Sequence, residues 1–224
     1  MQSAVKTVKT RKTMISLKIN DKEYEVPVSF DEITLGDYCR CFTGLEKTEG
    51  LEGGELFYAT RKNEAVVLSR LLGEDDSFAY GLPLPLYASL VDVCSFIYSI
   101  DGIKPSDFIE VDGRKYQAPE PNQMNLRQWI DIDMTMQDEN IDEGQKFIEL
   151  LSMIMLPLDD KGEMIPYGGQ DKEMPDKLRK LKASDALGTV HRFFLRGAIS
   201  SRLTEVLSRV ERMTDRSRLN TQGS

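Results

Sequence analysis

The chain has 224 residues, of which 40% are hydrophobic and 29% are charged, and its formal net charge is −8. This length is sufficient for one large domain or two small ones, and the composition is that of a soluble globular protein rather than a disordered or membrane-embedded one. Three cysteines do not make a disulfide framework, so a reducing cytoplasm is the expected site of synthesis.

The first residues predict a flexible basic arm, covering residues 1–14. The arm has no apolar core and is therefore not a secretory signal. Its charge is opposite to that of the acidic middle of the chain, so it is a candidate for docking onto a neighbouring protein. The candidate partner-binding residues of the arm are Lys6, Lys9, Arg11 and Lys12.

Residues 15–27 predict a two-residue β-hairpin. Asn20 and Asp21 tolerate the positive φ angles that such turns need, and closing the hairpin there fixes the register. The expected cross-strand pairs are Ile15 with Val26, Leu17 with Tyr24, and Lys18 with Glu23.

A similar pattern returns at residues 109–119, where Asp112 and Gly113 occupy the turn. The expected pairs are Ile109 with Tyr116 and Glu110 with Lys115. The second pair repeats the ion pair of the first hairpin with its signs exchanged.

A helix start follows each hairpin. Thr34 and Asn125 are natural N-caps, and Asp37 and Gln128 stand three residues later, where a capping-box partner would stand. The aligned apolar stripes are Leu35, Tyr38 and Cys39 in the first copy, and Leu126, Trp129 and Ile130 in the second. We therefore predict two pseudo-repeated units of a hairpin followed by helices, with Tyr38 and Trp129 largely buried against their own hairpins. The alternative is that both are ordinary local solutions to the same turn problem.

Further helices are expected in both halves. The first half should contain helices at 35–43 and 63–72, with Gly73 as a stop, and a longer one carrying Leu86, Leu90, Val93, Cys94 and Ile97. The second half should contain helices at 126–137, 143–156 and 176–181, with loop at 157–175. The sequence thus predicts a mainly helical α+β fold, with units at 15–102 and 103–224 that stand apart or form one compact domain.

A long terminal helix is expected from Ser184 to about Met213. Its apolar stripe is longer than the first half could cover, and uncovered stripes mark interaction surfaces. The candidate partner-binding residues on it are Leu203, Val206, Leu207 and Val210. Six arginines accompany three acidic residues between 196 and 218.

A search for catalytic, cofactor and metal sites yields no candidate residues. His191 is the single histidine and has no nucleophile elbow to serve, and Cys39 and Cys41 point apart on a helix. Acidic residues such as Asp131 and Asp133 are explained by solvation and by the helix dipole. Tyr167, in a Tyr-Gly-Gly loop, is expected to be exposed and available to an interface.

The chain resembles small proteins from the structural gene clusters of tailed bacteriophages. The order of elements, the segments 126–133 and 147–151, and the aromatic-rich end at 192–194 carry this resemblance. It implies a non-enzymatic virion-structural or tail/head assembly protein that acts through contacts with other phage proteins or with copies of itself. Such a protein is made in the host cytoplasm and can enter the virion.

Two other classes of function remain open. The basic ends are consistent with a nucleic-acid-associated accessory protein, although the acidic body disfavours binding to a duplex. An enzyme with an unrecognised site is the second alternative, disfavoured by the single histidine and the lack of a nucleophile motif. No membrane contact is expected, because the longest apolar runs are interrupted and too short to span a bilayer.

Overall fold

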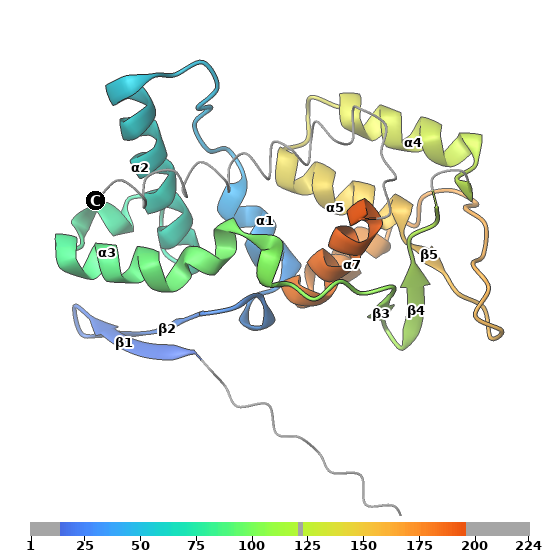
Figure 1. Ribbon diagram of the computed structural model, residues 1–224, viewed down its shortest axis with the longest axis horizontal. Helices are drawn as coiled ribbons and strands as arrows, with labels where there is room; N and C mark the ends of the chain where they lie inside the picture. The colour runs from blue at the N-terminus through green and yellow to red at the C-terminus, as the bar shows by residue number, and fades with distance from the viewer. Residues whose placement is uncertain (1–13, 121–122, 196–224) are drawn as a thin grey trace, which may run out of the picture.

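The computed structural model describes residues 14–120 and 123–195, and it is a mainly helical α+β fold, as the sequence predicts (Figure 1). The strands are β1 Ile15–Ile19, β2 Lys22–Val26, β3 Ile109–Val111, β4 Arg114–Gln117 and β5 Leu156–Pro157. The helices are α1 Leu35–Phe42, α2 Gly53–Leu71, α3 Leu84–Val93, α4 Leu126–Gln137, α5 Glu143–Ile154, α6 Met174–Arg179 and α7 Ala183–Leu195. Short 3-10 helices lie at Phe30–Glu32, Phe78–Gly81, Cys94–Tyr98 and Ile100–Gly102.

Both predicted hairpins form in the predicted register. All the expected cross-strand pairs are present, from Ile15 opposite Val26 to Glu110 opposite Lys115. The turn residues have positive φ, with Asn20 at 48° and Asp112 at 51°. The two hairpins differ in their neighbours: β5 pairs with β4 to give a three-stranded sheet, whereas β1 and β2 form a sheet of two strands.

The predicted N-caps are confirmed, but they work differently in the two helices. On α1, the Thr34 hydroxyl accepts from the backbone amide of Asp37, and the Asp37 carboxylate accepts from the amide of Thr34, which completes a capping box. On α4, Asn125 accepts from the amide of Gln128. The Gln128 side chain is buried instead and donates to the carbonyl of Met153 on α5, at 2.8 Å.

The predicted buried stripe of α4 is wrong. Leu126 and Ile130 are 76% and 49% exposed, and Trp129 is only half-buried at the edge of the core. The buried face carries Gln128 and Ile132 instead, because α4 packs against α5 and Gln128 serves the end of that helix. On α1, by contrast, Leu35, Tyr38 and Cys39 are buried as expected. The hairpins and the caps form as predicted, but the pseudo-repeat is not confirmed.

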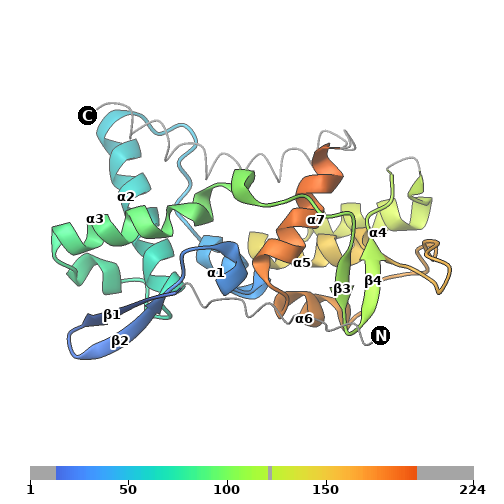
Figure 2. The ribbon, with the colours of Figure 1, turned by 60° about the horizontal axis from the view of Figure 1, so that its bottom comes forward.

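Two hydrophobic clusters build the interior. The smaller one lies between the first hairpin, α2 and α3, and contains Ile19, Tyr24, Val26, Leu68 and Leu90. The larger one joins α1 to α5, α6, α7 and the second hairpin, so it draws residues from both sides of residue 102. In Figures 1 and 2, α1 lies between the α2–α3 part and the part containing α4 to α7.

Backbone hydrogen bonds fasten α1 to the second half of the chain. The amide of Leu35 donates to the carbonyl of Leu181 at 2.8 Å, and the amide of Ala183 donates to the carbonyl of Ile33 at 2.9 Å. The start of α1 is thereby held against the turn between α6 and α7.

Several element boundaries differ from the sequence predictions, and the helix expected at 143–156 ends at Ile154, with Leu156 and Pro157 in β5. α2 begins at Gly53, ten residues earlier than expected. The first half of this helix carries no buried apolar stripe, so the sequence pattern gave no sign of it. The expected long helix after Pro83 ends as α3 at Val93 and continues as a 3-10 helix to Tyr98. α7 is described to Leu195, so its predicted continuation lies outside the described residues.

Within the described ranges, no helix combines the length and apolarity needed to span a membrane.

The face that α4 buries can be tested with two identical substitutions. Ile132 is 2% exposed and Ile130 is 49% exposed on the same helix. Ile132→Ala should lower the free energy of unfolding by about 2–5 kcal/mol, because it leaves a cavity. Ile130→Ala should cost less than about 1 kcal/mol. Urea denaturation measures both, and equal costs would contradict the described packing of α4.

A second stability test concerns the hydroxyl of Tyr38. Tyr38 is 3% exposed, and its hydroxyl has no hydrogen-bond partner among the described residues. Burial raises the pKa of this phenol above its ordinary value, so it is neutral at pH 7. Tyr38→Phe removes an unpaired polar group and keeps the ring, so it should leave stability unchanged or raise it by about 1–3 kcal/mol. A loss of stability in thermal denaturation would show that the hydroxyl has a partner.

Candidate functional site

A wide groove of about 1770 Å³ is the candidate functional site. Its walls come from α2, α3, the 3-10 helices after α3, the segment leading to β3, and the start of α7. Figure 2 shows the course of the chain from α3 to β3, whose residues form one of these walls. Apolar and aromatic side chains dominate the lining, namely Phe30, Phe57, Tyr58, Tyr80, Leu82, Leu84, Tyr87, Val91, Phe96, Tyr98, Ile103 and Phe108.

Several of these apolar side chains are open to solvent. Phe57 and Tyr58, on the first half of α2, are 58% and 68% exposed, and Tyr80 and Leu84, which line the same groove, are 56% and 76% exposed. Scattered exposed apolar residues are ordinary on protein surfaces, but several that line one concave surface mark an interaction site. This gathering is the main functional signal of the structure.

A buried carboxylate lies within the groove. Glu64 is 8% exposed, and its Oε2 accepts from Arg61 at 2.6 Å and from the Tyr87 hydroxyl at 3.5 Å. Burial, together with the charge of Glu64, raises the pKa of Tyr87 to about 12, so the phenol remains a donor at neutral pH. The Arg61 guanidinium also lies 5.4 Å from the centre of the Phe57 ring. These contacts fix the polar centre of a largely apolar surface.

Helix α7 holds the wall formed by residues 103–108. The amide of Ser106 donates to the carbonyl of Gly188 at 3.0 Å, and Arg192 Nε lies 2.9 Å from Asp107 Oδ1. A Cβ on Gly188 would lie 2.7 Å from the carbonyl oxygen of Lys104, so this close approach requires glycine. His191 is half-buried with Nδ1 3.4 Å from the carbonyl oxygen of Ile103, which is a packing position on the same wall.

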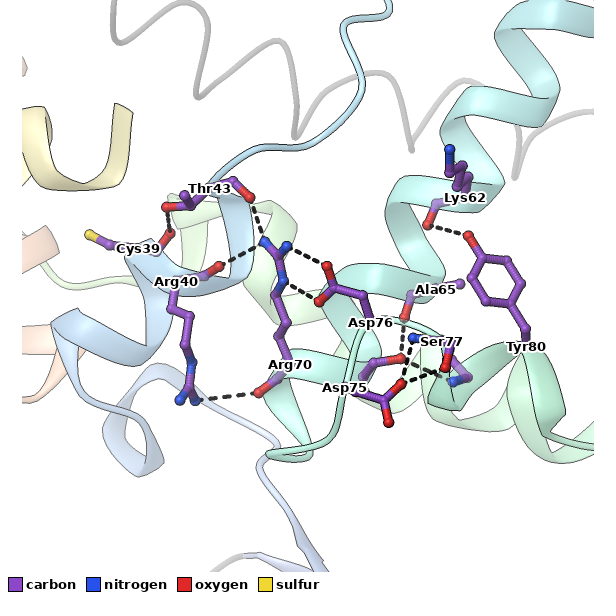
Figure 3. A network of polar contacts seen from close by, with 12 residues as sticks. Cys39, Arg40, Thr43, Lys62, Ala65, Arg70, Asp75, Asp76, Ser77 and Tyr80 are labelled. Atoms are coloured by element: carbon purple, nitrogen blue, oxygen red, sulfur yellow. Dashed lines mark hydrogen bonds and ion pairs between the residues drawn. The ribbon is translucent and has the colours of Figure 1, made fainter. Parts of the chain in front are cut away.

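Arg70 fixes the position of α2 relative to α1 (Figure 3). Its guanidinium donates to the carbonyls of Arg40 and Thr43, which are exposed at the end of α1, and forms two 2.6 Å contacts with the carboxylate of Asp76. A cation at a helix C-terminus also complements the helix dipole. In the same view, the Tyr80 hydroxyl donates to the carbonyl of Lys62 at 3.4 Å, which ties the 3-10 helix Phe78–Gly81 to α2.

The partner-binding residues predicted from the sequence lie outside the described residues. These are Lys6, Lys9, Arg11 and Lys12 of the arm and Leu203, Val206, Leu207 and Val210 of the terminal segment. Their roles therefore remain predictions.

The prediction that Tyr167 is exposed is wrong. Its side chain is 9% exposed, and its hydroxyl donates to Asp131 Oδ2 at 2.8 Å. The reason is that the 157–175 loop folds back on α4, where Asn125 also donates to the carbonyl of Tyr167. Burial raises the pKa of Tyr167, so it serves as a neutral donor to Asp131.

The three cysteines are buried as separate thiols. Burial raises the pKa of each of Cys39, Cys41 and Cys94 to about 12, so none is a reactive thiolate at neutral pH. Within residues 14–120 and 123–195, no group of three or more histidine, cysteine or acidic residues is placed to hold a metal ion.

The groove itself was missed by sequence reasoning. The available signal was the aromatic pair Phe57–Tyr58, which follows a glycine-rich stretch and belongs to no buried stripe. Comparison of the chain with protein-family models, with curated proteins and with solved structures gives no match.

The Arg70–Asp76 contact predicts a dependence of stability on pH. The hydrogen bonds from Arg70 lower the pKa of Asp76, so the folded state binds fewer protons than the unfolded state near the ordinary pKa of about 4. The stabilisation is therefore present above about pH 4 and is lost as the pH falls through the lowered pKa.

Asp76→Asn tests this dependence directly. Because Asp76 is 55% exposed, the variant should be about 0.5–1 kcal/mol less stable than the original chain at pH 7. The difference should shrink towards zero at pH 3, and it should also shrink in 1 M salt. Urea denaturation at each condition measures it, and a difference that is constant with pH would contradict the role of the carboxylate.

Proposed function

We propose that this protein is a non-enzymatic assembly protein of a tailed bacteriophage, and that the aromatic groove between α2 and α3 receives its protein partner. The observation that supports the proposal is the exposure of Phe57, Tyr58, Tyr80 and Leu84 along one concave surface. Aromatic residues are the most frequent energetic anchors of protein interfaces, because they bury a large area with few rotatable bonds.

The size of the groove favours a polypeptide over a small molecule. Small-molecule sites have volumes of about 300–1000 Å³, whereas this groove measures about 1770 Å³. An amphipathic helix is about 10–12 Å across and presents apolar anchors at positions i, i+3, i+4 and i+7. A helix laid along the groove would cover the exposed aromatic side chains in that manner.

The viral context comes from the sequence resemblance. Under this proposal the partners are other structural or assembly proteins of the phage, or further copies of this chain, and the protein is made in the host cytoplasm and can be carried into the virion. The basic arm with Lys6, Lys9, Arg11 and Lys12 adds electrostatic attraction to an acidic neighbour. Such attraction acts only within about 8 Å at physiological salt.

Site-specific photo-crosslinking tests the proposal. A photoreactive phenylalanine derivative is placed at Tyr58, in cells that also make the proteins encoded by the neighbouring genes. We expect a single defined adduct with one of those proteins. The same derivative at Met134, which is 67% exposed on α4, is the matched control and should give none.

A groove variant then measures the contribution of the aromatic surface. Phe57→Ser alters a side chain that is already 58% exposed, so folding should be unaffected. It should weaken binding of the identified partner at least tenfold, as measured by titration calorimetry with purified proteins. Equal adduct yields at positions 58 and 134, or turnover of a substrate by the protein alone, would contradict the proposal.

A further inference from the structure

We infer that the partner segment is an amphipathic helix with a one-sided charge pattern. Its apolar side chains lie along the α2 part of the groove, and its cationic side chains lie beside the start of α7. This inference rests on the proposed function, because it names the chemistry of the segment that the groove receives. Three features support it: the order of residues along α3, the position of the exposed carboxylates, and the pairing of the cations on α2.

The lining of the groove changes from apolar to polar along α3. Six lining residues on α3 and the following 3-10 helix are spaced so that they share one helical face: Leu84, Tyr87, Ala88, Val91, Asp92 and Ser95. The first four are apolar or aromatic, and the last two are polar. Leu84 and Asp92 are about 12 Å apart along the axis of α3. A helix that lies along the groove therefore meets different chemistry at its two ends.

Helix α2 lies beside the apolar end of this face. The Tyr80 hydroxyl, shortly before the start of α3, donates to the carbonyl of Lys62 on α2 at 3.4 Å. The exposed apolar side chains of the groove belong to this part of the molecule. We call it the aromatic end, and its residues are Phe57, Tyr58, Tyr80 and Leu84.

The start of α7 lies beside the polar end. The rings of Phe30 and Phe96 are 5.1 Å apart, and the Ser184 hydroxyl donates to Asp31 Oδ1 at 2.6 Å. Three exposed carboxylates line this part of the groove, which we call the acidic end: Asp31, Asp92 and Asp185. Within residues 14–120 and 123–195, none of the three forms an ion pair.

The other charges near the acidic end leave it negative. Asp107 also lines the groove, and it is engaged by Arg192 at 2.9 Å. Lys104 is a single exposed cation beside the three carboxylates. A surface of one charge attracts a partner of the opposite charge and fixes its orientation.

The cations at the aromatic end are already paired within the chain. Arg61 lies 2.6 Å from Glu64 Oε2, and Lys62 pairs with Glu46. A charged side chain of the partner would therefore lose its hydration there without gaining a new ion pair. Apolar anchors gain more at this end, because they cover exposed rings.

The two ends together exclude other kinds of segment. An acidic helix would place like charges against Asp92 and Asp185, which is unfavourable. A wholly apolar helix would cover the same carboxylates without supplying a counter-charge. A helix with apolar anchors and one basic end satisfies both parts of the groove.

Selection from a peptide library tests the inference. The probe is a ribosome-displayed library of helices about 18 residues long, which is sufficient for an isolated helix to form. Leucine is fixed at positions i, i+3, i+4 and i+7, and the flanking positions are randomised. Against the full-length chain we expect enrichment of lysine and arginine at one end of the helix. Against Asp92→Lys we expect this bias to be lost.

Binding of the most enriched peptide, measured by fluorescence anisotropy, isolates the contribution of the acidic end. Asp92→Lys should weaken binding at least tenfold, because attraction becomes repulsion, and high salt should reduce the difference. Folding should be unaffected, since Asp92 is exposed in the last turn of α3, where a cation complements the helix dipole. Asp160→Lys makes the same change of net charge at an exposed position outside the groove, and it should alter binding less than twofold.

Several results would overturn the inference. These are enrichment of acidic peptides, enrichment without any charge bias, no enrichment at all, or equal effects of Asp92→Lys and Asp160→Lys. A dimer mass by light scattering that Phe57→Ser reduces to that of a monomer would assign the groove to a second copy of the chain, and it would also overturn the inference.

The selection uses no protein from the neighbouring genes, whereas the photo-crosslinking at Tyr58 requires one. Successful crosslinking with an unbiased selection therefore rejects only this inference. A selection biased towards basic ends, with no adduct at Tyr58, rejects only the proposed function.

Discussion

The fold depends on the burial of α1, a helix of only eight residues. A helix this short is marginal in water, so packing and end contacts must stabilise it. Leu35 and Cys41 are 0% exposed on different sides of the helix, which shows that neighbours surround it. The Thr34–Asp37 capping box satisfies its first amides, and Arg70 satisfies carbonyls at its end. Because α1 contacts α2, α5, α6 and α7, loss of this helix would separate both parts of the molecule.

The groove follows from how α2 is anchored to α1. Arg70, in the last turn of α2, is held at the end of α1, and Ala65 and Leu68 pack into the smaller core. The first half of α2 extends beyond that core, so Phe57 and Tyr58 remain largely exposed. The second wall is set independently, since Gly188 and Arg192 of α7 hold residues 103–108 in place. The groove thus has two rigid walls that belong to different parts of the chain.

Features encoded by short-range interactions could be predicted from the sequence. The hairpin registers follow from turn residues with positive φ, and the caps at Thr34 and Asn125 follow from side chains that bond to amides three residues away. Features that depend on distant partners were missed. Gln128 is buried because a carbonyl of α5 needs a donor, and Tyr167 is buried because its loop returns to Asp131. The groove belongs to the second kind, because its residues come from α2, α3 and α7.

The same distinction explains why two similar local sequences have different environments. The segments beginning at Thr34 and Asn125 share a hairpin, a cap and a helix start, yet α1 is central and α4 is peripheral. The residue at the third helical position decides this difference. Asp37 is short and charged and turns back to its own cap, whereas Gln128 is longer and neutral and reaches α5, where its amide nitrogen donates to the carbonyl of Met153. A local pattern therefore specifies where a helix begins. Which face of that helix is buried depends on the side chains that remain free to contact distant parts of the chain.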